Sequence, residues 1–503
     1  MVYRILTWFL RVVTRVFFRQ IEVVGLENIP ATGGVVFAGN HPNSLIDPIL
    51  ILTSCGRKVH FAAKAALFKG RLMRAVLGGL GAVPIQRRDD HDGTPRHEPA
   101  PAAAAAAAID NDAAFAAMFT VLASGGAIGI FPEGLSHDSS QLARLKTGAA
   151  RLALGGAHRA GAPIAVVPCG LTFIHPKRFR SRVLVQYGAP IAIPPAPAPP
   201  TGDAVRALTA ELDAALRRLT INAPDWDTVR ALDAVRRLYQ PREISIGDRV
   251  ELARRFNTHY AAVAHDPRVV ALMRRVHAYQ AALDDLGVAD RELARDLTGL
   301  EIAARMIRHI TLLVFWVPLL VPGAPLHVPA VAFARIAGPR LTPRKDVIAT
   351  TKLLVGMLLV QLSYAAAIAA LWWRIGPGAA LIAAVVLPLS GIATLRVLDR
   401  LRLVRRASGV LLRRMRFRRE VAALRAERER LVAEVVRVVG EVKPPELAAL
   451  FPPDDPRRKP AGDPRPPDRA ERSDRAECGD RPERSGRPEC GDRGECGDRG
   501  PPP

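Results

Sequence analysis

The sequence predicts a chain of several parts: an α/β domain with helices covering a sheet, then a helical region, a transmembrane helical hairpin and a disordered tail. Three observations support this organisation. Short β-branched runs alternate with helical stretches over about residues 20–195. Two apolar runs between residues 351 and 397 are about long enough to cross a bilayer. Residues 452–503 consist mostly of Pro, Arg, Asp, Glu and Gly.

Apolar and charged residues are segregated along the chain. Its 503 residues are 49% hydrophobic and 24% charged, with a net charge of +23 and a mean hydropathy of +0.10. The positive excess indicates an anionic partner, which could be nucleic acid, a membrane surface or a phosphorylated substrate. The aromatic content of 5% weakens the nucleic-acid interpretation, because base stacking depends on aromatic side chains. Five scattered cysteines do not make a disulfide framework, so we expect a reducing compartment.

Residues 1–20 are predicted to form an amphipathic helix that lies in the membrane interface. Four arginines interrupt the apolar run, and no small-residue cleavage site follows, so a secretory signal is not indicated. At about 100° per residue these arginines share one face of the helix, and large apolar side chains cover much of the rest. The alternative is a helix that packs its apolar face against its own domain.

Residues 21–195 are predicted to form the α/β domain. The expected strands are Gly34–Ala38, Val59–Ala62, Ala82–Gln86, Ala127–Phe131, Ile164–Gly170 and Arg182–Tyr187, with helices at Phe115–Ala123 and Lys146–Gly155 between them. Residues 89–108 form a charged, then Pro/Ala-rich insert that we expect to be a surface loop running into a helix. The Pro-rich stretch 190–200 marks the end of the domain, and residues 202–308 are predicted to be helical.

Residues 309–398 are predicted to form the membrane region. Residues 310–334 are apolar but contain four prolines, so we expect a broken or re-entrant segment rather than a straight spanning helix. Residues 351–373 and 377–397 are long enough, or nearly so, to span the hydrocarbon core, and a short Gly/Pro turn joins them. They predict a transmembrane hairpin, and the alternative is a buried hairpin in a soluble helical bundle.

Basic residues flank this hairpin. Arg344 and Lys345 precede the first span, and an arginine-rich helix is predicted over residues 399–445 after the second. The positive-inside rule places both flanks in the cytoplasm and the turn outside. Residues 452–503 contain a Glu-Cys-Gly-Asp sequence three times but no large apolar residue, and we expect this tail to be disordered.

A histidine and an aspartate follow the first predicted strand. His41 comes shortly after the strand 34–38, and Asp47 lies six residues further on. The carboxylate can hold one ring nitrogen of the histidine and leave the other free as a base. A histidine near an aspartate in a loop is also commonly structural, so both interpretations stay open on spacing alone.

Charged residues follow other strands of the predicted sheet. Glu133 stands between a proline and Gly134 at the end of the strand 127–131, either as a group that binds a substrate hydroxyl or as a solvated turn residue. Lys146 lies beside a predicted helix start, where backbone N–H groups can bind phosphate. Arg87 ends the strand 82–86 and could supply a further contact to an anion.

Taken together, these blocks resemble the phospholipid/glycerol acyltransferase family over about residues 20–190. Four motifs occur in the family's order: Asn40-His41 with Asp47, then Gly81–Arg87, then Phe131–Gly134, then Val166–Pro168. Five residues separate the histidine from the aspartate, where most of the family has four. With Ser136-His137-Asp138 and Leu145-Lys146-Thr147-Gly148, this resembles the subgroup of glycerol-3-phosphate and dihydroxyacetone-phosphate acyltransferases and related bacterial proteins.

The resemblance implies transfer of a fatty acyl group from acyl-CoA or acyl carrier protein to a hydroxyl of a glycerol phosphate or lysophospholipid. The expected reaction is 1-acylglycerol-3-phosphate to phosphatidic acid. One alternative is acylation of glycerol 3-phosphate or dihydroxyacetone phosphate, and another is a non-catalytic membrane protein that binds lipid. His41 and Asp47 would be catalytic, while Arg87, Glu133, Gly134 and Lys146 would bind the acceptor.

Several further expectations follow from this interpretation. No metal or cofactor is required, because the thioester is already activated. The partners would be membrane lipids, the acceptor and the acyl donor, with no nucleic acid. The location would be the inner cell membrane, with the catalytic domain and tail on the cytoplasmic side. The Ala/Arg/Pro bias of the composition suggests a bacterial source.

Overall fold

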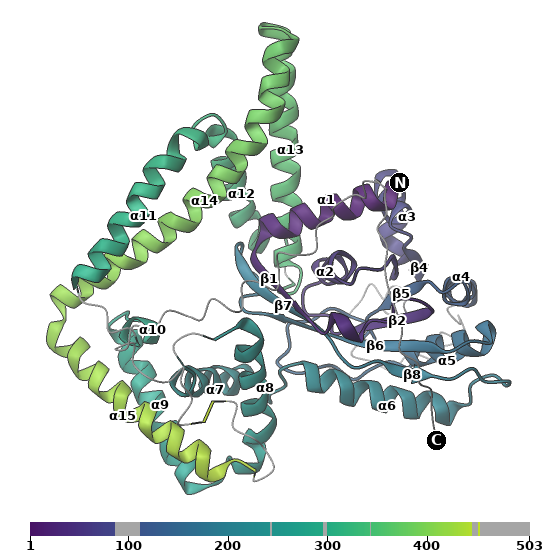
Figure 1. The fold of residues 1–503 in the computed structure, drawn as a ribbon, viewed down its shortest axis with the longest axis horizontal. Coiled ribbons are helices and arrows are strands. Elements are labelled where there is room, and N and C mark those ends of the chain that lie inside the picture. Colours follow the sequence, from purple (N-terminus) through teal and green to yellow (C-terminus); the bar gives the residue numbers. More distant parts are fainter. Residues whose placement is uncertain (86–110, 242–243, 295–298, 343, 445–450, 453–503) are drawn as a thin grey trace, which may run out of the picture. The chain divides into compact units, whose positions relative to one another are not determined.

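A computed structural model describes residues 1–85, 111–241, 244–294, 299–342, 344–444 and 451–452 (Figure 1). Three predictions fall outside these residues. They are the anion contact by Arg87, the insert at 89–108 and the disordered tail from residue 453 onward.

The chain begins with helix α1 (Val2–Phe17), which runs directly into strand β1 (Phe18–Val24). The helix ends at Phe17 instead of residue 20 because Phe18 pairs with Ser181 at the edge of the sheet. The ring of Phe18 is 1% exposed and packs edge-to-face on Phe17. Burial of that side chain at a sheet edge therefore outweighs continuation of the helical pattern.

The first domain is built on an eight-stranded sheet in the order β1-β7-β6-β2-β5-β3-β4, with β8 paired to β6. The remaining strands are β2 (Gly34–Gly39), β3 (Val59–Lys64), β4 (Val83–Ile85), β5 (Ala127–Ile130), β6 (Ile164–Phe173), β7 (Ser181–Tyr187) and β8 (Ile191–Ile193). Strand β2 is parallel to both β5 and β6, and Ala38 lies opposite Ile130. The chain segments that leave β2 and β5 therefore start side by side at the carboxyl ends of these parallel strands.

Helices cover both faces of this sheet, which confirms the predicted α/β class (Figure 1). Helices α1 and α2 (Ile46–Ser54) pack on one face, where Phe37 and Val185 point into the core. Helices α4 (Asp112–Ala123), α5 (Gly148–Ala160) and α6 (Gly202–Leu219) cover the other face, around Val36 and Ile128. The short helix α3 (Arg71–Gly79) contacts α1. Two strands were not predicted, β1 and β8, and both are peripheral in the sheet.

A second apolar cluster joins the helical region to the end of the described chain. It contains side chains from α7 (Trp226–Tyr239), α8 (Ile246–Val263), α9 (Pro267–Asp285) and α15 (Arg418–Val442), with the short α10 (Asp290–Leu293) beside them. Arg428 of α15 forms an ion pair with Asp290, at 2.9 Å. Residues from before and after the apolar helices thus form one bundle.

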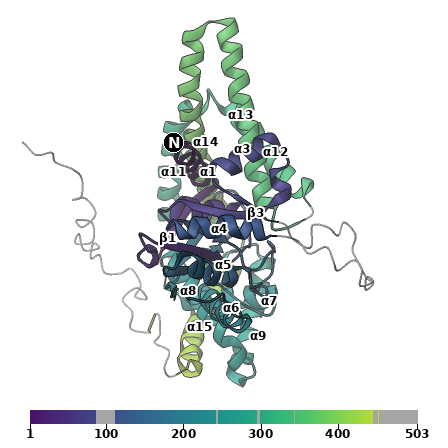
Figure 2. The same cartoon turned by 90° about the vertical axis from the view of Figure 1, so that its right-hand side faces the viewer.

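Among the described residues, three helices are long and apolar enough to cross a membrane, by length and composition: α11 (Gly299–Leu320), α13 (Ile348–Arg374) and α14 (Pro377–Arg416). Helices α13 and α14 lie side by side, joined by a tight turn (Figure 2). A break at 321–323 separates α11 from α12 (Ala324–Leu341). Helix α14 continues beyond residue 397, and the basic helix predicted over 399–445 is divided near Phe417, whose ring packs against the second apolar cluster.

Candidate active site

The loop after β2 carries a histidine–aspartate pair. Asn40 holds the start of this loop against β6, because its side chain accepts from Leu171 N–H and donates to the Leu171 carbonyl. His41 follows, and its Nδ1 lies 2.9 Å from Asp47 Oδ2. Asp47 is fully buried in the first turn of α2. The structure therefore brings together the two residues that the sequence singled out as a possible dyad.

Asp47 is held by more than the histidine. The backbone N–H of Asn43 donates to the same oxygen, Oδ2, at 2.7 Å. Burial raises the pKa of Asp47 above its ordinary value, and the hydrogen bonds from His41 and Asn43 oppose that shift only in part. A carboxylate in this position orients the imidazole ring and stabilises the imidazolium that forms when the ring takes up a proton.

The ring of His41 is also fixed by stacking. It lies parallel to the ring of Phe131, with 4.1 Å between centroids and 10° between planes. The side chain is 11% exposed, and its Nε2 makes no hydrogen bond to any residue that the structure describes. When Nδ1 donates to Asp47, Nε2 is the ring nitrogen that is left to accept a proton.

Glu133, which follows β5, supports the histidine through its backbone. Its Oε1 accepts the backbone N–H of His41 at 2.7 Å. Its Oε2 accepts from the Ala143 N–H at 2.8 Å and pairs with Nε2 of His137. Glu133 is only 2% exposed, so its carboxylate is occupied by these buried hydrogen bonds. The hydrogen bond from the His41 N–H to Glu133 could not be predicted from the spacing of the two residues in the sequence.

His137 is a functional candidate whose role the sequence did not assign, although it stands in the block that follows Glu133. Its backbone N–H donates to the His41 carbonyl at 3.2 Å, and Ser44 N–H donates to the neighbouring Ser136 Oγ at 3.0 Å. These bonds join the loop after β5 to the loop after β2. The one clue in the sequence was its position directly after the motif of Glu133.

The pairing with Glu133 predicts a pH dependence. That hydrogen bond raises the pKa of His137 above its ordinary 6.5, while burial opposes the shift, and Asp346 and Asp138 add to the rise. A raised pKa in the folded state contributes stability fully below the ordinary pKa and loses it as the pH rises through the raised value. We expect His137→Gln to lower the unfolding temperature more at about pH 6 than at about pH 9.

Thermal unfolding of the purified protein over this pH range measures the difference. His265→Gln, at an exposed position between α8 and α9, is the matched control and should show no such trend. A destabilisation by His137→Gln that is the same at every pH would contradict the pairing.

Gly134 and Lys146 lie against each other beside this centre. Gly134 has a φ of +75°, which strains any other residue, and a Cβ there would lie 2.7 Å from Lys146 Cδ and would displace the lysine side chain. Lys146 N–H donates to the Pro132 carbonyl at 2.7 Å, which places the lysine just before the start of α5. An ammonium group and a helix N-terminus thus adjoin the loop that carries Glu133.

Two cysteines of the domain are unsuited to act as nucleophiles. Cys55 and Cys169 are buried, and burial raises the pKa of both thiols. A thiol kept protonated and covered is a poor nucleophile. The geometry therefore leaves the His41–Asp47 pair, rather than either thiol, as the reactive arrangement at this site.

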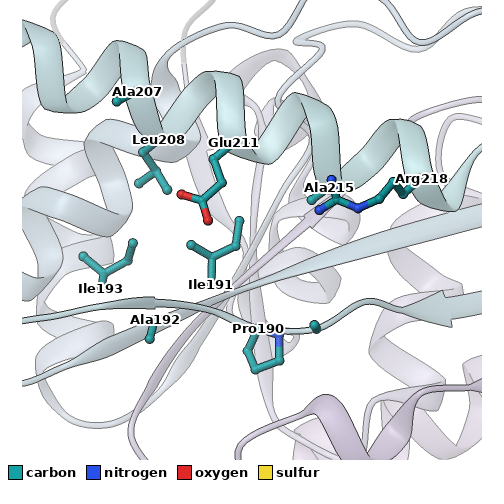
Figure 3. Close-up of a pocket in the computed structure, with 10 residues that line it drawn as sticks. Pro190, Ile191, Ala192, Ile193, Ala207, Leu208, Glu211, Ala215 and Arg218 are labelled. Carbon is teal, nitrogen blue, oxygen red and sulfur yellow. The ribbon is translucent and has the colours of Figure 1, made fainter.

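A separate pocket lies between β8 and α6, with a volume of about 440 Å³ (Figure 3). Its charged lining residues are Glu211 and Arg218, and the side chains of Ile191 and Leu208 also face into it. None of the residues predicted from the sequence to act in the site lines this pocket.

Two family models match the chain. The one described as Acyltransferase matches residues 20–172, and the one described as Glycerol-3-phosphate acyltransferase 2 C-terminal domain matches residues 231–447. The first match covers β2 to β5, most of β1 and β6, and the dyad, but neither β7 nor β8. The second covers the helical region from within α7 onward, the apolar helices and all of α15.

Two curated relatives from Saccharomyces cerevisiae are similar to the chain. Glycerol-3-phosphate O-acyltransferase 2 is 34% identical over 279 residues, which is 51% of this chain and 37% of the relative. Glycerol-3-phosphate O-acyltransferase 1 is 27% identical over 456 residues, which is 72% of this chain and 60% of the relative. The chain thus spans less than two thirds of the length of each. Both are fungal, so they lend no support to the bacterial source that composition suggested.

Among solved structures, the 1-acyl-sn-glycerophosphate (LPA) acyltransferase PlsC from Thermotoga maritima aligns with 42% of this chain and 76% of its own. The TM-score is 0.31 and the identity 20%, a similarity too weak to bear on fold or function. The chain contains an acyltransferase domain over residues 20–172, and the second family model and both yeast relatives make it similar to glycerol-3-phosphate acyltransferases.

Proposed function

We propose that this protein transfers a fatty acyl group from a thioester, acyl-CoA or acyl carrier protein, to a hydroxyl of glycerol 3-phosphate, with dihydroxyacetone phosphate as the close alternative. The observation that carries the proposal is the hydrogen bond between buried Asp47 and Nδ1 of His41, which leaves Nε2 of the partly exposed ring to act as the base. The names of both yeast relatives favour glycerol 3-phosphate over the 1-acylglycerol-3-phosphate that the sequence placed first.

In the proposed reaction His41 acts as a general base. Its Nε2 removes the proton from the acceptor hydroxyl while the oxygen attacks the thioester carbonyl. A carbon–oxygen bond forms, the carbon–sulfur bond breaks, and the departing thiolate takes the proton back from the imidazolium. Asp47 holds the ring in the required tautomer through Nδ1. The thioester is already activated, so the proposal includes neither an acyl-enzyme nor a cofactor.

The other predicted residues take supporting parts in this proposal. Glu133 positions His41 through its backbone N–H, and Gly134 keeps the turn open beside the base. Lys146, just before the start of α5, would bind the acceptor phosphate as a point charge. Phosphate binding by Arg87 stays a prediction from the sequence, since this residue lies outside the described ones.

We also propose that the protein acts at a membrane. Helices α13 and α14 would form the spanning hairpin, and the exposed apolar side chains of α1, which include Ile5, Trp8 and Val12, would lie in the interface. Both flanks of the hairpin, with the sheet domain, would face the cytoplasm. A fatty acyl product dissolves in a bilayer, so catalysis at its surface places the product where it is soluble.

A panel of acceptors tests the assignment. Membranes that contain the protein are supplied with labelled acyl-CoA and, in turn, glycerol 3-phosphate, dihydroxyacetone phosphate and 1-acylglycerol-3-phosphate. We expect glycerol 3-phosphate to give the highest kcat/KM. Turnover of 1-acylglycerol-3-phosphate alone would restore the acceptor first expected from the sequence, and saturable lipid binding without turnover of any acceptor would favour a non-catalytic protein.

A further inference from the structure

The segment that leads into α13 contacts the catalytic loops, although it lies far from them in the sequence. Residues 344–353 include the end of the linker after α12 and the first turns of α13. This segment belongs to the apolar helices, yet several of its side chains are buried against the sheet domain. We call it the α13 lead segment.

Thr350 makes the contact that reaches the dyad. Its Oγ1 donates to the Asn43 carbonyl at 3.3 Å, across 307 positions of sequence. Asn43 is 1% exposed, and its own N–H is the group that shares Asp47 Oδ2 with His41. The hydroxyl of Thr350 thus holds the carbonyl of Asn43, while the N–H of the same residue holds the carboxylate of Asp47.

Arg344 and Lys352 reach the other loops. Arg344 Nη2 donates to the Ser136 carbonyl at 2.8 Å and pairs with Asp346 at 2.8 Å. Ser136 in turn accepts the N–H of Ser44 through its Oγ. Lys352 Nζ donates to the carbonyl of Lys177, in the loop between β6 and β7, at 2.8 Å.

Apolar packing supports these polar contacts. Ala349 is fully buried and Leu353 is 5% exposed. Both belong to the same apolar cluster as Ile46 and Leu50 of α2, the helix that carries Asp47. The first turns of α13 therefore belong to the core of the sheet domain before the helix continues outward.

We propose that the α13 lead segment is a positioning element of the active site, with Thr350 as its central residue. The sheet domain supplies the dyad, and residues 344–353 hold the loops that carry it in the productive arrangement. The two parts of the chain matched by separate family models then form a single catalytic unit. This inference rests on the proposed acyl transfer and deepens it.

The test compares Thr350→Val with Thr351→Val in the full chain. Valine keeps the shape of threonine but removes the hydroxyl. Thr351 is the matched control, because its Oγ1 donates only within α13, to the Val347 carbonyl. We expect Thr350→Val to lower kcat by about 2- to 10-fold, the effect of losing one neutral hydrogen bond, with the acceptor KM unchanged. Thr350→Ser should restore kcat, and Thr351→Val should match the wild type.

A second variant serves if Thr350→Val does not fold. Arg344→Gln removes the bond to Ser136 from outside the helix, with Arg340→Gln, at an exposed position of α12, as its control. We expect a lower kcat for Arg344→Gln alone, with unfolding temperatures that agree between variant and control.

The outcomes separate the two proposals. A wild type without turnover of any acceptor refutes the proposed function. An active wild type whose kcat is unchanged by Thr350→Val and by Arg344→Gln overturns the positioning role alone. The positioning role is also overturned if kcat falls only in step with the unfolding temperature, because the segment would then contribute stability and nothing specific to catalysis.

Discussion

Replacing His41 by alanine is expected to lower kcat by about 10²–10⁴-fold, the range that a positioned general base contributes. The acceptor KM should change little, because the proposed phosphate contact at Lys146 stays in place. The variant should remain in the membrane, since the candidate spans and α1 lie elsewhere in the chain. Acyl transfer from labelled acyl-CoA by purified protein in lipid vesicles measures the effect.

Two further variants help to interpret the effect of His41→Ala on kcat. Asp47→Asn keeps an oxygen that can accept from Nδ1 and from the Asn43 N–H, but it removes the negative charge that stabilises the imidazolium. We expect it to approach the defect of His41→Ala. His265→Ala alters an exposed histidine and should leave kcat unchanged. An active His41→Ala protein would refute the assignment of the base.

The second large effect is expected for Glu133→Gln, on stability as well as activity. The carboxylate accepts from His41 N–H, Ala143 N–H and His137, all in a buried setting. An amide of the same shape turns one oxygen into a donor and leaves a buried N–H group unpaired, which costs about 1–3 kcal/mol. We expect a free energy of unfolding lower by that amount and kcat at least about 10-fold lower, because the His41 backbone loses its support.

Denaturant unfolding and acyl transfer on the same preparations measure both effects. Glu211→Gln makes the same chemical change at an exposed position of α6 and should alter neither quantity. If the structural account of Glu133 is wrong and the residue serves only to bind the acceptor, Glu133→Gln will raise KM while the free energy of unfolding stays at the wild-type value.

The sequence alone was enough to predict the class of the fold and to place the dyad at the carboxyl ends of the parallel strands. Runs such as 34–38 and 127–131 are buried on both faces, so their apolar pattern is strong, and both are strands in the structure. Parallel neighbours end at a common edge, which is why motifs about 90 residues apart meet there. His41 and Asp47 were found because they lie only six positions apart.

The parts that could not be predicted depend on contacts rather than on local pattern. After the buried Phe18, β1 has exposed and half-buried positions without a regular alternation, so its pattern does not separate it from the helical stretch before it. The structural role of Glu133 rests on its hydrogen bond with the backbone N–H of His41, which lies 92 positions away in the sequence. Thr350 stands directly before the span predicted over residues 351–373, and its hydrogen bond to Asn43 could not be predicted from that position.

The contact between Thr350 and Asn43 also has a consequence for the order of events during synthesis. A ribosome releases the strands of the sheet, which end at Ile193, well before it releases residues 344–353. Domains fold in the order in which they emerge. A nascent sheet domain could therefore fold before α13 is made, and its catalytic loops would then lack the hydrogen bonds from residues 344–353. The proposed positioning of the catalytic loops would therefore be complete only after residues 344–353 of this candidate span have been made.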